Sequence, residues 1–406
     1  MKKLFIFELI YYLLLNVIGP IIYYGLRGGS VFIYHDPFPS EYMYKAALLI
    51  SVPVIITLIL VAFVLPIGKS KIKQDLTRNV EWYFIGICAI SIVKMLFVGK
   101  FANYGAINGT LWGYLGFFMD MGVLLTVILA TSAGKTHMLL IGTVYLVTTL
   151  MAYSRQGPLI LVLAILIALL VNDNYKKLRK RMLIIILCIC IAAPIVFAVS
   201  SLGRGKGTKD LDTVTEVTDL IVGRCSQLEL LGRALYQSEN DLWNEAVFQE
   251  KYSIENQAKQ CVNAVVIGGV FEEDIMPNQY YRMIFMEYPE DVVKSAYTSI
   301  NLTLPGYLSL KYPVVVAIVV PVIVLLLIYL LACYAKWPSY FSVTLLIFGT
   351  NSLMGFFDWV MVLNDFRRFL CTLLMLWLVH KLIDKFIPKD IVRKKINIFG
   401  FLKKKA

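Results

Sequence analysis

Long apolar runs recur along this chain, and they limit its fold more than any other feature. Many of them approach the twenty or so residues that an α-helix needs to cross a hydrocarbon core of about 30 Å. The apolar residues do not alternate with polar ones, and helices satisfy their own backbone polar groups inside a membrane. Because 59% of the 406 residues are hydrophobic and only 16% are charged, the sequence predicts an all-α polytopic membrane protein.

The apolar runs predict ten transmembrane helices. The first run follows Lys2 and Lys3, as the apolar part of a signal peptide would. It is long, however, and no small-residue cleavage site follows Tyr24, so we expect it to remain as an anchor. The ten predicted ranges are 4–24, 43–67, 82–98, 111–131, 138–153, 157–171, 182–202, 312–334, 339–357 and 366–383.

The distribution of lysine and arginine predicts the orientation of these helices. Loops that are retained in the cytoplasm are rich in basic residues, which places both termini and the "KKLRKR" run, residues 176–181, inside. The net charge of +12 then reflects topology and attraction to anionic lipids rather than nucleic-acid binding. The predicted regions are spans 1–7 over 1–202, a large periplasmic or extracellular loop over 203–311, spans 8–10 over 312–383, and a basic cytoplasmic tail over 384–406.

The large outward loop contains a segment, "VTEVTDLIVGRCSQLELLGRALYQ", with the periodicity of an amphipathic helix. At 100° per residue, Arg224 falls within about 40° of an apolar stripe, so it is predicted on the buried face. Arg233 points to the opposite face and follows Glu229 by four residues, which is the geometry of an exposed ion pair. Arg224 is therefore the stronger functional candidate of the two. The stripe consists of Val217, Leu220, Leu228, Leu231 and Leu235.

Arg155 lies in the motif "SRQGPL" at the turn between two short predicted spans. Each span has about 16 residues and a length of about 24 Å, which is shorter than the hydrocarbon core. The turn should therefore lie slightly below the membrane surface. A guanidinium there either faces a polar cavity or extends to a lipid headgroup, and the sequence leaves both interpretations open.

Further arginines are predicted on the same outward face as Arg155. A planar guanidinium binds phosphate through two hydrogen bonds and keeps its charge, so several arginines from separate loops would suit a diphosphate. An ion pair with Asp365 or Asp358 is the simpler role for the last two. The predicted substrate-binding residues are Arg204, Arg282, Arg367 and Arg368.

Several short motifs occur in a characteristic order around the large loop. "SRQGPL" precedes it, "GR" (Gly223 and Arg224) lies within it, and "PNQYY" and "TLPGYLSLKYP" come near its end. In these motifs, and in its layout over most of the chain, the protein resembles the O-antigen polymerase family, the repeat-unit polymerases of bacterial surface-polysaccharide assembly.

The resemblance implies a metal-independent glycosyltransferase of the bacterial cell inner membrane, without a cofactor. It would transfer a growing glycan from undecaprenyl diphosphate to the non-reducing end of a lipid-linked repeat unit, on the outer face. Arg155 and Arg224 match the family's outward-loop arginines and would be catalytic, stabilising charge on the diphosphate as the glycosidic bond breaks. A chain-length-regulating co-polymerase is the partner that the family implies.

The acceptor hydroxyl must also lose a proton to a base. The three histidines, His35, His137 and His380, all lie outside the large loop, whereas the related O-antigen ligases are thought to use a histidine. A carboxylate is the better candidate, although the sequence does not choose among those available. They are Asp219, Glu229, Glu272, Glu273, Asp274, Glu287 and Asp358.

Two other classes of protein compete with the polymerase interpretation. A transporter or flippase for lipid-linked oligosaccharide would have the same apolar composition, and Lys94 and Asp120 inside predicted spans would suit an ion relay. Transporters often have two matching halves, and no such repeat is visible. An O-antigen ligase is the third alternative. A metal site at Asp210 and Asp212 is disfavoured, and a disulfide between Cys225 and Cys261 stays open.

Overall fold

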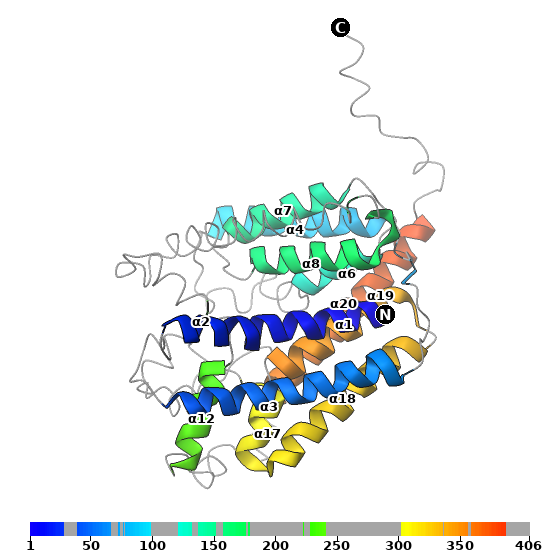
Figure 1. The fold of residues 1–406 in the computed structure, drawn as a ribbon. Helices are drawn as coiled ribbons and strands as arrows, with labels where there is room; N and C mark the ends of the chain where they lie inside the picture. The colour runs from blue at the N-terminus through cyan, green and yellow to red at the C-terminus, as the bar shows by residue number, and fades with distance from the viewer. Residues whose placement is uncertain are drawn as a thin grey trace.

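The computed structural model of the protein is an assembly of long helices (Figure 1). The residues it describes are almost entirely helical, and no β-strand is found among them. The all-α prediction is therefore confirmed for this part of the chain. The described residues are 1–27, 39–65, 72–73, 76, 78–98, 121–131, 137–151, 157–175, 178, 222, 228–240, 302–335, 337–355 and 359–386.

The helices begin and end close to the predicted ranges. Two of the long helices contain a π-helical turn, and a third such turn continues α19. The helical elements in the first half of the chain are α1 (Lys2–Leu13), η1 (Leu14–Ile18), α2 (Gly19–Arg27), α3 (Ser40–Ile59), η2 (Leu60–Val64), α4 (Arg78–Val98), α6 (Met121–Thr131), α7 (His137–Met151), α8 (Gly157–Val171) and η4 (Asp173–Tyr175). Those in the second half are α12 (Leu228–Glu239), α17 (Leu304–Lys311), α18 (Val314–Tyr334), α19 (Ser339–Thr350), η5 (Asn351–Gly355) and α20 (Trp359–Phe386).

Three helical segments are long and apolar enough to cross a membrane, counting only the described residues. They are Lys2–Arg27, Ser40–Val64 and Val314–Tyr334. Shorter apolar helices cover other predicted ranges, among them Met121–Thr131, Met138–Met151 and Gly157–Val171. The predicted span 182–202 and residues 111–120 lie outside the described residues. The chain therefore has the helices of a membrane protein, and the number of ten crossings stays a prediction.

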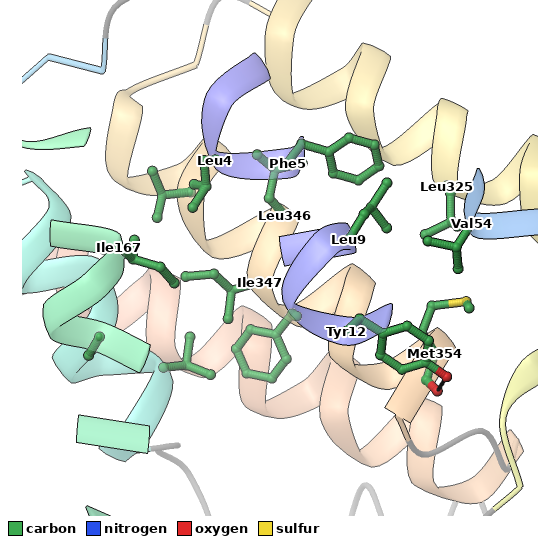
Figure 2. Packing of buried hydrophobic residues seen from close by; sticks show 14 of the residues in the cluster. Leu4, Phe5, Leu9, Tyr12, Val54, Ile167, Leu325, Leu346, Ile347 and Met354 are labelled. Atoms are coloured by element: carbon green, nitrogen blue, oxygen red, sulfur yellow. Dashed lines mark hydrogen bonds between the residues drawn. The ribbon is translucent and has the colours of Figure 1, made fainter. Parts of the chain in front are cut away.

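Helix α1 lies at the centre of the bundle. Its side chains Leu4, Phe5 and Leu9 have no exposed surface, and Figure 2 shows them surrounded by residues of four other elements. The Phe5 ring stacks on Tyr329 with 5.2 Å between ring centroids. Such close packing of apolar side chains fixes the neighbouring helices relative to α1. The surrounding residues are Val54 of α3, Ile167 of α8, Leu325 of α18, and Leu346 and Ile347 of α19.

Hydrogen bonds between helix ends define one end of the bundle, which we call the Lys2 end. Lys2 Nζ donates to the Ala62 carbonyl at 3.1 Å, so α1 begins where η2 finishes. The backbone N–H of Leu76 donates to the Thr131 carbonyl at 3.4 Å, and Asn172 Nδ2 donates to the Leu129 carbonyl at 2.9 Å. The other end, where α2 finishes and α3 begins, is called the Tyr24 end. In the predicted topology the Lys2 end is cytoplasmic and the Tyr24 end faces outward.

Large apolar side chains cover much of the outer surface. Phe63 is 85% exposed, and Phe97 is 87% exposed. Helix α20 carries an exposed apolar stripe at helical spacing. Contiguous apolar surface of this kind is unfavourable in water but suits contact with lipid chains, so the surface agrees with a membrane protein. The stripe consists of Phe366, Leu370, Leu374, Trp377 and Leu382.

Candidate functional site

Helix α12 is the part of the large loop that carries the candidate site. It packs against α3 and also contacts α17 (Figure 1). Its apolar residues Leu228, Leu231 and Leu235 are buried, as the predicted stripe requires. That part of the helical prediction is therefore confirmed.

The opposite face of α12 is also buried. Glu229, Arg233 and Gln237 follow one another at intervals of four residues, which places them on one face of the helix. They are 1%, 5% and 3% exposed. The prediction that Glu229 and Arg233 form an exposed pair on the outer surface is therefore wrong. Helical periodicity distinguishes the two faces of α12, but it does not reveal that other segments cover both.

A hydrogen bond links this polar face to the first membrane helix. Tyr24 Oη, near the end of α2, donates to Glu229 Oε2 at 3.2 Å, and both residues are buried. A hydrogen bond to a carboxylate stabilises the charged form and is stronger than a neutral one. The contact therefore fixes α12 against the Tyr24 end of the bundle.

The exposed edge of α12 is held on α3 by charge and by aromatic contact. Lys45 Nζ lies 3.1 and 2.8 Å from the two carboxylate oxygens of Glu239. The rings of Tyr42 and Tyr236 meet edge to face at 5.2 Å between centroids. The hydrogen bond from Lys45 lowers the pKa of Glu239 below its ordinary value. These contacts give α12 one defined position on the bundle.

The motif "TLPGYLSLKYP" forms the capped helix α17 and the turn that leads into α18. Thr303 Oγ1 accepts a hydrogen bond from the Gly306 N–H at 3.1 Å, which satisfies one free donor of the first turn. A Cβ at Gly306 would lie 2.8 Å from Leu231 Cδ1, so glycine permits the close approach of α17 to α12. Helix α17 also contacts η5. The motif thus forms a helix that contacts both α12 and α3.

Arg155 comes between α7 and α8 in the sequence and lies outside the described residues. The helix ends on either side of it are in tight contact, because an added Cβ at Gly157 would overlap the Thr149 side chain. Helix α8 begins on the side of the bundle where α2 finishes (Figure 1). The predicted site residues Arg204, Arg224 and Arg282 also lie outside the described residues.

The adjacent residues Arg367 and Arg368 have different surroundings in α20. Arg367 is 7% exposed. Arg368 Nη1 lies 3.8 Å from Asp365 Oδ1, in a half-buried pair. The other oxygen of Asp365 accepts a hydrogen bond from Ser352 Oγ at 2.9 Å. Arg368 therefore forms the ion pair that its spacing from Asp365 suggests, and Arg367 is the more deeply buried of the two.

The described part of the chain contains one of the seven carboxylates named as candidate bases, Glu229. The remaining six lie outside it, as do Cys225 and Cys261. Cys88, Cys333 and Cys371 are free thiols. No group of three or more His, Cys, Asp and Glu side chains suited to a metal ion occurs among the described residues.

Two members of the site were missed by the sequence interpretation, Tyr24 and Gln237. Tyr24 lies at the end of a predicted span, where interfacial tyrosines are common, so the sequence does not distinguish it. Gln237 continues the spacing of Glu229 and Arg233, and this repeat was the signal that would have identified it. Together the buried residues offer a carboxylate, a guanidinium, a phenol and an amide, which can accept a proton, bind an anion and bind a sugar hydroxyl. Comparison with known proteins found no match to this chain among family models, curated proteins or solved structures.

Proposed function

We propose that this protein is a polymerase of lipid-linked oligosaccharide repeat units in a bacterial inner membrane. It transfers the growing glycan from undecaprenyl diphosphate to the non-reducing end of a lipid-linked repeat unit, on the outer face, and releases undecaprenyl diphosphate. The resemblance of its motifs and layout to the O-antigen polymerase family supports this reaction.

The observation that carries the proposal is the buried charged face of α12 at the Tyr24 end. Glu229 and Arg233 are almost completely shielded from water although they come from a predicted outward loop. Charged groups in such a site act more strongly on a reacting diphosphate than they would in water. A structural scaffold or a plain lipid anchor has no need of them.

Each residue of this face has a role in the proposed reaction. Glu229 takes the proton of the acceptor hydroxyl, and its bond to Tyr24 keeps the carboxylate oriented. Arg233 joins Arg155 and Arg224 in stabilising the charge that develops on the leaving diphosphate. Arg204, Arg282, Arg367 and Arg368 bind the two lipid-linked substrates, and a co-polymerase that regulates chain length is the expected partner.

Deletion of the gene tests the reaction against its main alternative. Loss of a polymerase leaves a cell surface with single repeat units, whereas loss of a flippase removes these units as well. A ligase defect instead leaves long chains on undecaprenyl diphosphate. Surface glycans resolved by electrophoresis distinguish the three outcomes, and complete loss of repeat units would contradict the proposal.

Protein variants expressed in the deletion strain test the site. Arg155→Ala and Arg224→Ala should abolish long chains while the protein remains inserted in the membrane. Arg181→Ala, in the predicted cytoplasmic loop, removes the same charge and is the matched control, with normal chains expected. Normal polymer in both site variants would reject the proposed roles.

A further inference from the structure

A polar seam crosses the apolar core between α1 and the α19–η5 segment. Tyr12 Oη donates to the Met354 carbonyl at 2.8 Å (Figure 2). One turn earlier in α1, the Glu8 carboxyl faces the Thr350 hydroxyl. We call Glu8, Tyr12, Thr350 and the Met354 carbonyl the α1–η5 seam.

Glu8 is the one acidic side chain of α1, and it lies inside a segment long enough to cross a membrane. The residue is 8% exposed, and its Oε2 has no hydrogen-bond partner. Thr350 is 4% exposed, and its Oγ1 also lacks a partner within hydrogen-bonding geometry. The two groups therefore face each other without forming a well-aligned bond.

The helices packed around α1 supply no positive charge to Glu8. Helix α8 contains no ionisable side chain, and the ionisable residues of α3 lie in its first six positions, at the Tyr24 end. Helix α18 contributes Tyr329, Cys333 and Tyr334, and α19 contributes Tyr340. At the start of α1, Lys2 bonds to the Ala62 carbonyl, Lys3 is exposed, and the Met1 amino group lies near Cys333. No Lys, Arg or His pairs with Glu8 within the described part of the chain.

The backbone opposite Glu8 is irregular. Thr350 is the last residue of α19, and the π-helical turn η5 begins immediately after it. A π-helical turn interrupts the regular bonding of an α-helix and is frequently found at functional sites. The Met354 carbonyl within this turn accepts the hydrogen bond from Tyr12. Both α1 and the α19–η5 segment therefore contribute polar groups to the seam.

We propose that Glu8 is a proton-binding site in the membrane interior, with its carboxyl group carrying a proton in the folded protein and Thr350 as its neighbour. An ionised carboxylate without a counter-charge is strongly disfavoured in such surroundings, whereas the neutral acid is tolerated. The site requires no glycan substrate, so it goes beyond the proposed polymerase and does not depend on it.

Reaction with dicyclohexylcarbodiimide tests the proposal in the full-length protein. This apolar reagent needs a protonated carboxyl. The acid proton moves to a carbodiimide nitrogen, a carboxyl oxygen adds to the central carbon, and rearrangement gives a stable N-acylurea with no atom lost. The protein is reconstituted in phosphatidylcholine and phosphatidylglycerol vesicles at neutral pH, digested and analysed by mass spectrometry.

Glu8 should be labelled at least roughly tenfold more than Glu41, an exposed acid at the start of α3, since only the buried carboxyl keeps its proton. A water-soluble carbodiimide with an added amine should reverse this preference. Absence of label on Glu8 would overturn the proposal. Protection of Glu8 by NaCl, relative to choline chloride at the same pH, would also overturn it, because a metal ion would then occupy the site.

Glu8→Gln provides a second test, because the amide resembles the neutral acid in size and lacks the ability to ionise. The unfolded chain ionises Glu8 in the ordinary carboxyl range, whereas the folded protein keeps the proton. The melting temperature of the wild-type protein should therefore fall progressively as the pH rises from mildly acidic values, until Glu8 ionises in the folded protein as well, and this fall should be smaller in the variant. An equal pH dependence of the two proteins would count against the site. Neither result depends on polymer formation, so failure here is distinguishable from failure of the proposed function.

Discussion

Tyr24 and Glu229 are separated by 205 positions in the sequence, and a hydrogen bond of 3.2 Å joins them. It connects the end of the first membrane helix to a helix of the large loop. Both residues are buried, so water does not compete for the bond. The loop is therefore part of the bundle at this point, and the charged face of α12 depends on the position of α2.

Removal of the phenol should weaken this connection. Tyr24→Phe removes one hydrogen-bond donor from the buried Glu229 carboxylate, and a hydrogen bond to a charged group contributes about 1.5 to 3 kcal/mol. The melting temperature in detergent should fall accordingly, and polymer formation should fall with it if Glu229 is the base. Tyr44→Phe, at a tyrosine that is 57% exposed, is the matched control. Equal melting temperatures of the two variants would show that the bond does not contribute.

Glu229 and Arg233 should be energetically coupled, because they share the buried face of α12 one helical turn apart. In a double-mutant cycle with Glu229→Gln and Arg233→Met, the double variant should be more stable than the sum of the single changes predicts. A coupling of about 0.5 to 3 kcal/mol is typical of neighbouring buried groups. Chemical unfolding in mild detergent measures it.

The exposed pair Lys45 and Glu239 is the control for this cycle. Its side chains are 45% and 50% exposed, so solvent screens the interaction and the coupling should be smaller. Additive effects at Glu229 and Arg233 would mean that each residue has a separate partner.

Gly157 should be essential to the packing of α7 against α8. A methyl group there overlaps the Thr149 side chain close to its own backbone, where it is unable to rotate away. Gly157→Ala should therefore reduce the free energy of unfolding by about 1 to 3 kcal/mol and lower the melting temperature. It should also disturb the start of α8, two residues after Arg155. Gly86→Ala is the matched control, because no atom lies within 4 Å of a Cβ at that position. The control should leave stability unchanged or raise it slightly.

The docking of α12 on α3 should weaken in acid. The hydrogen bond from Lys45 holds the pKa of Glu239 below its ordinary value of 4.5. The pair therefore stabilises the folded protein above pH 4.5, and its contribution is lost as the pH falls through the lower value of the folded state. Hydrogen exchange of the α12 backbone amides across this pH range measures the effect. Lys45→Met should remove the pH dependence, and its persistence in that variant would assign it to another group.

The sequence alone determined where several of the described helices lie. Apolar runs predicted the ranges of α3 with η2, of α8 and of α18 closely, because a segment in lipid has to satisfy its backbone internally and has few alternatives to a helix. The stripe of Leu228, Leu231 and Leu235 was predicted for the same kind of reason, since helical spacing is a local property.

Tertiary structure decided which segments cover each helix. The periodicity of α12 gave no sign that α2 and α17 would approach it, so Arg233 was predicted on an exposed face and is instead buried. Glu8 could be assigned to a span from the sequence, but its position against Thr350 depends on how α1 packs on α19. The spacing of side chains along one helix is set by local backbone geometry, whereas their burial depends on contacts between segments that are distant in the chain.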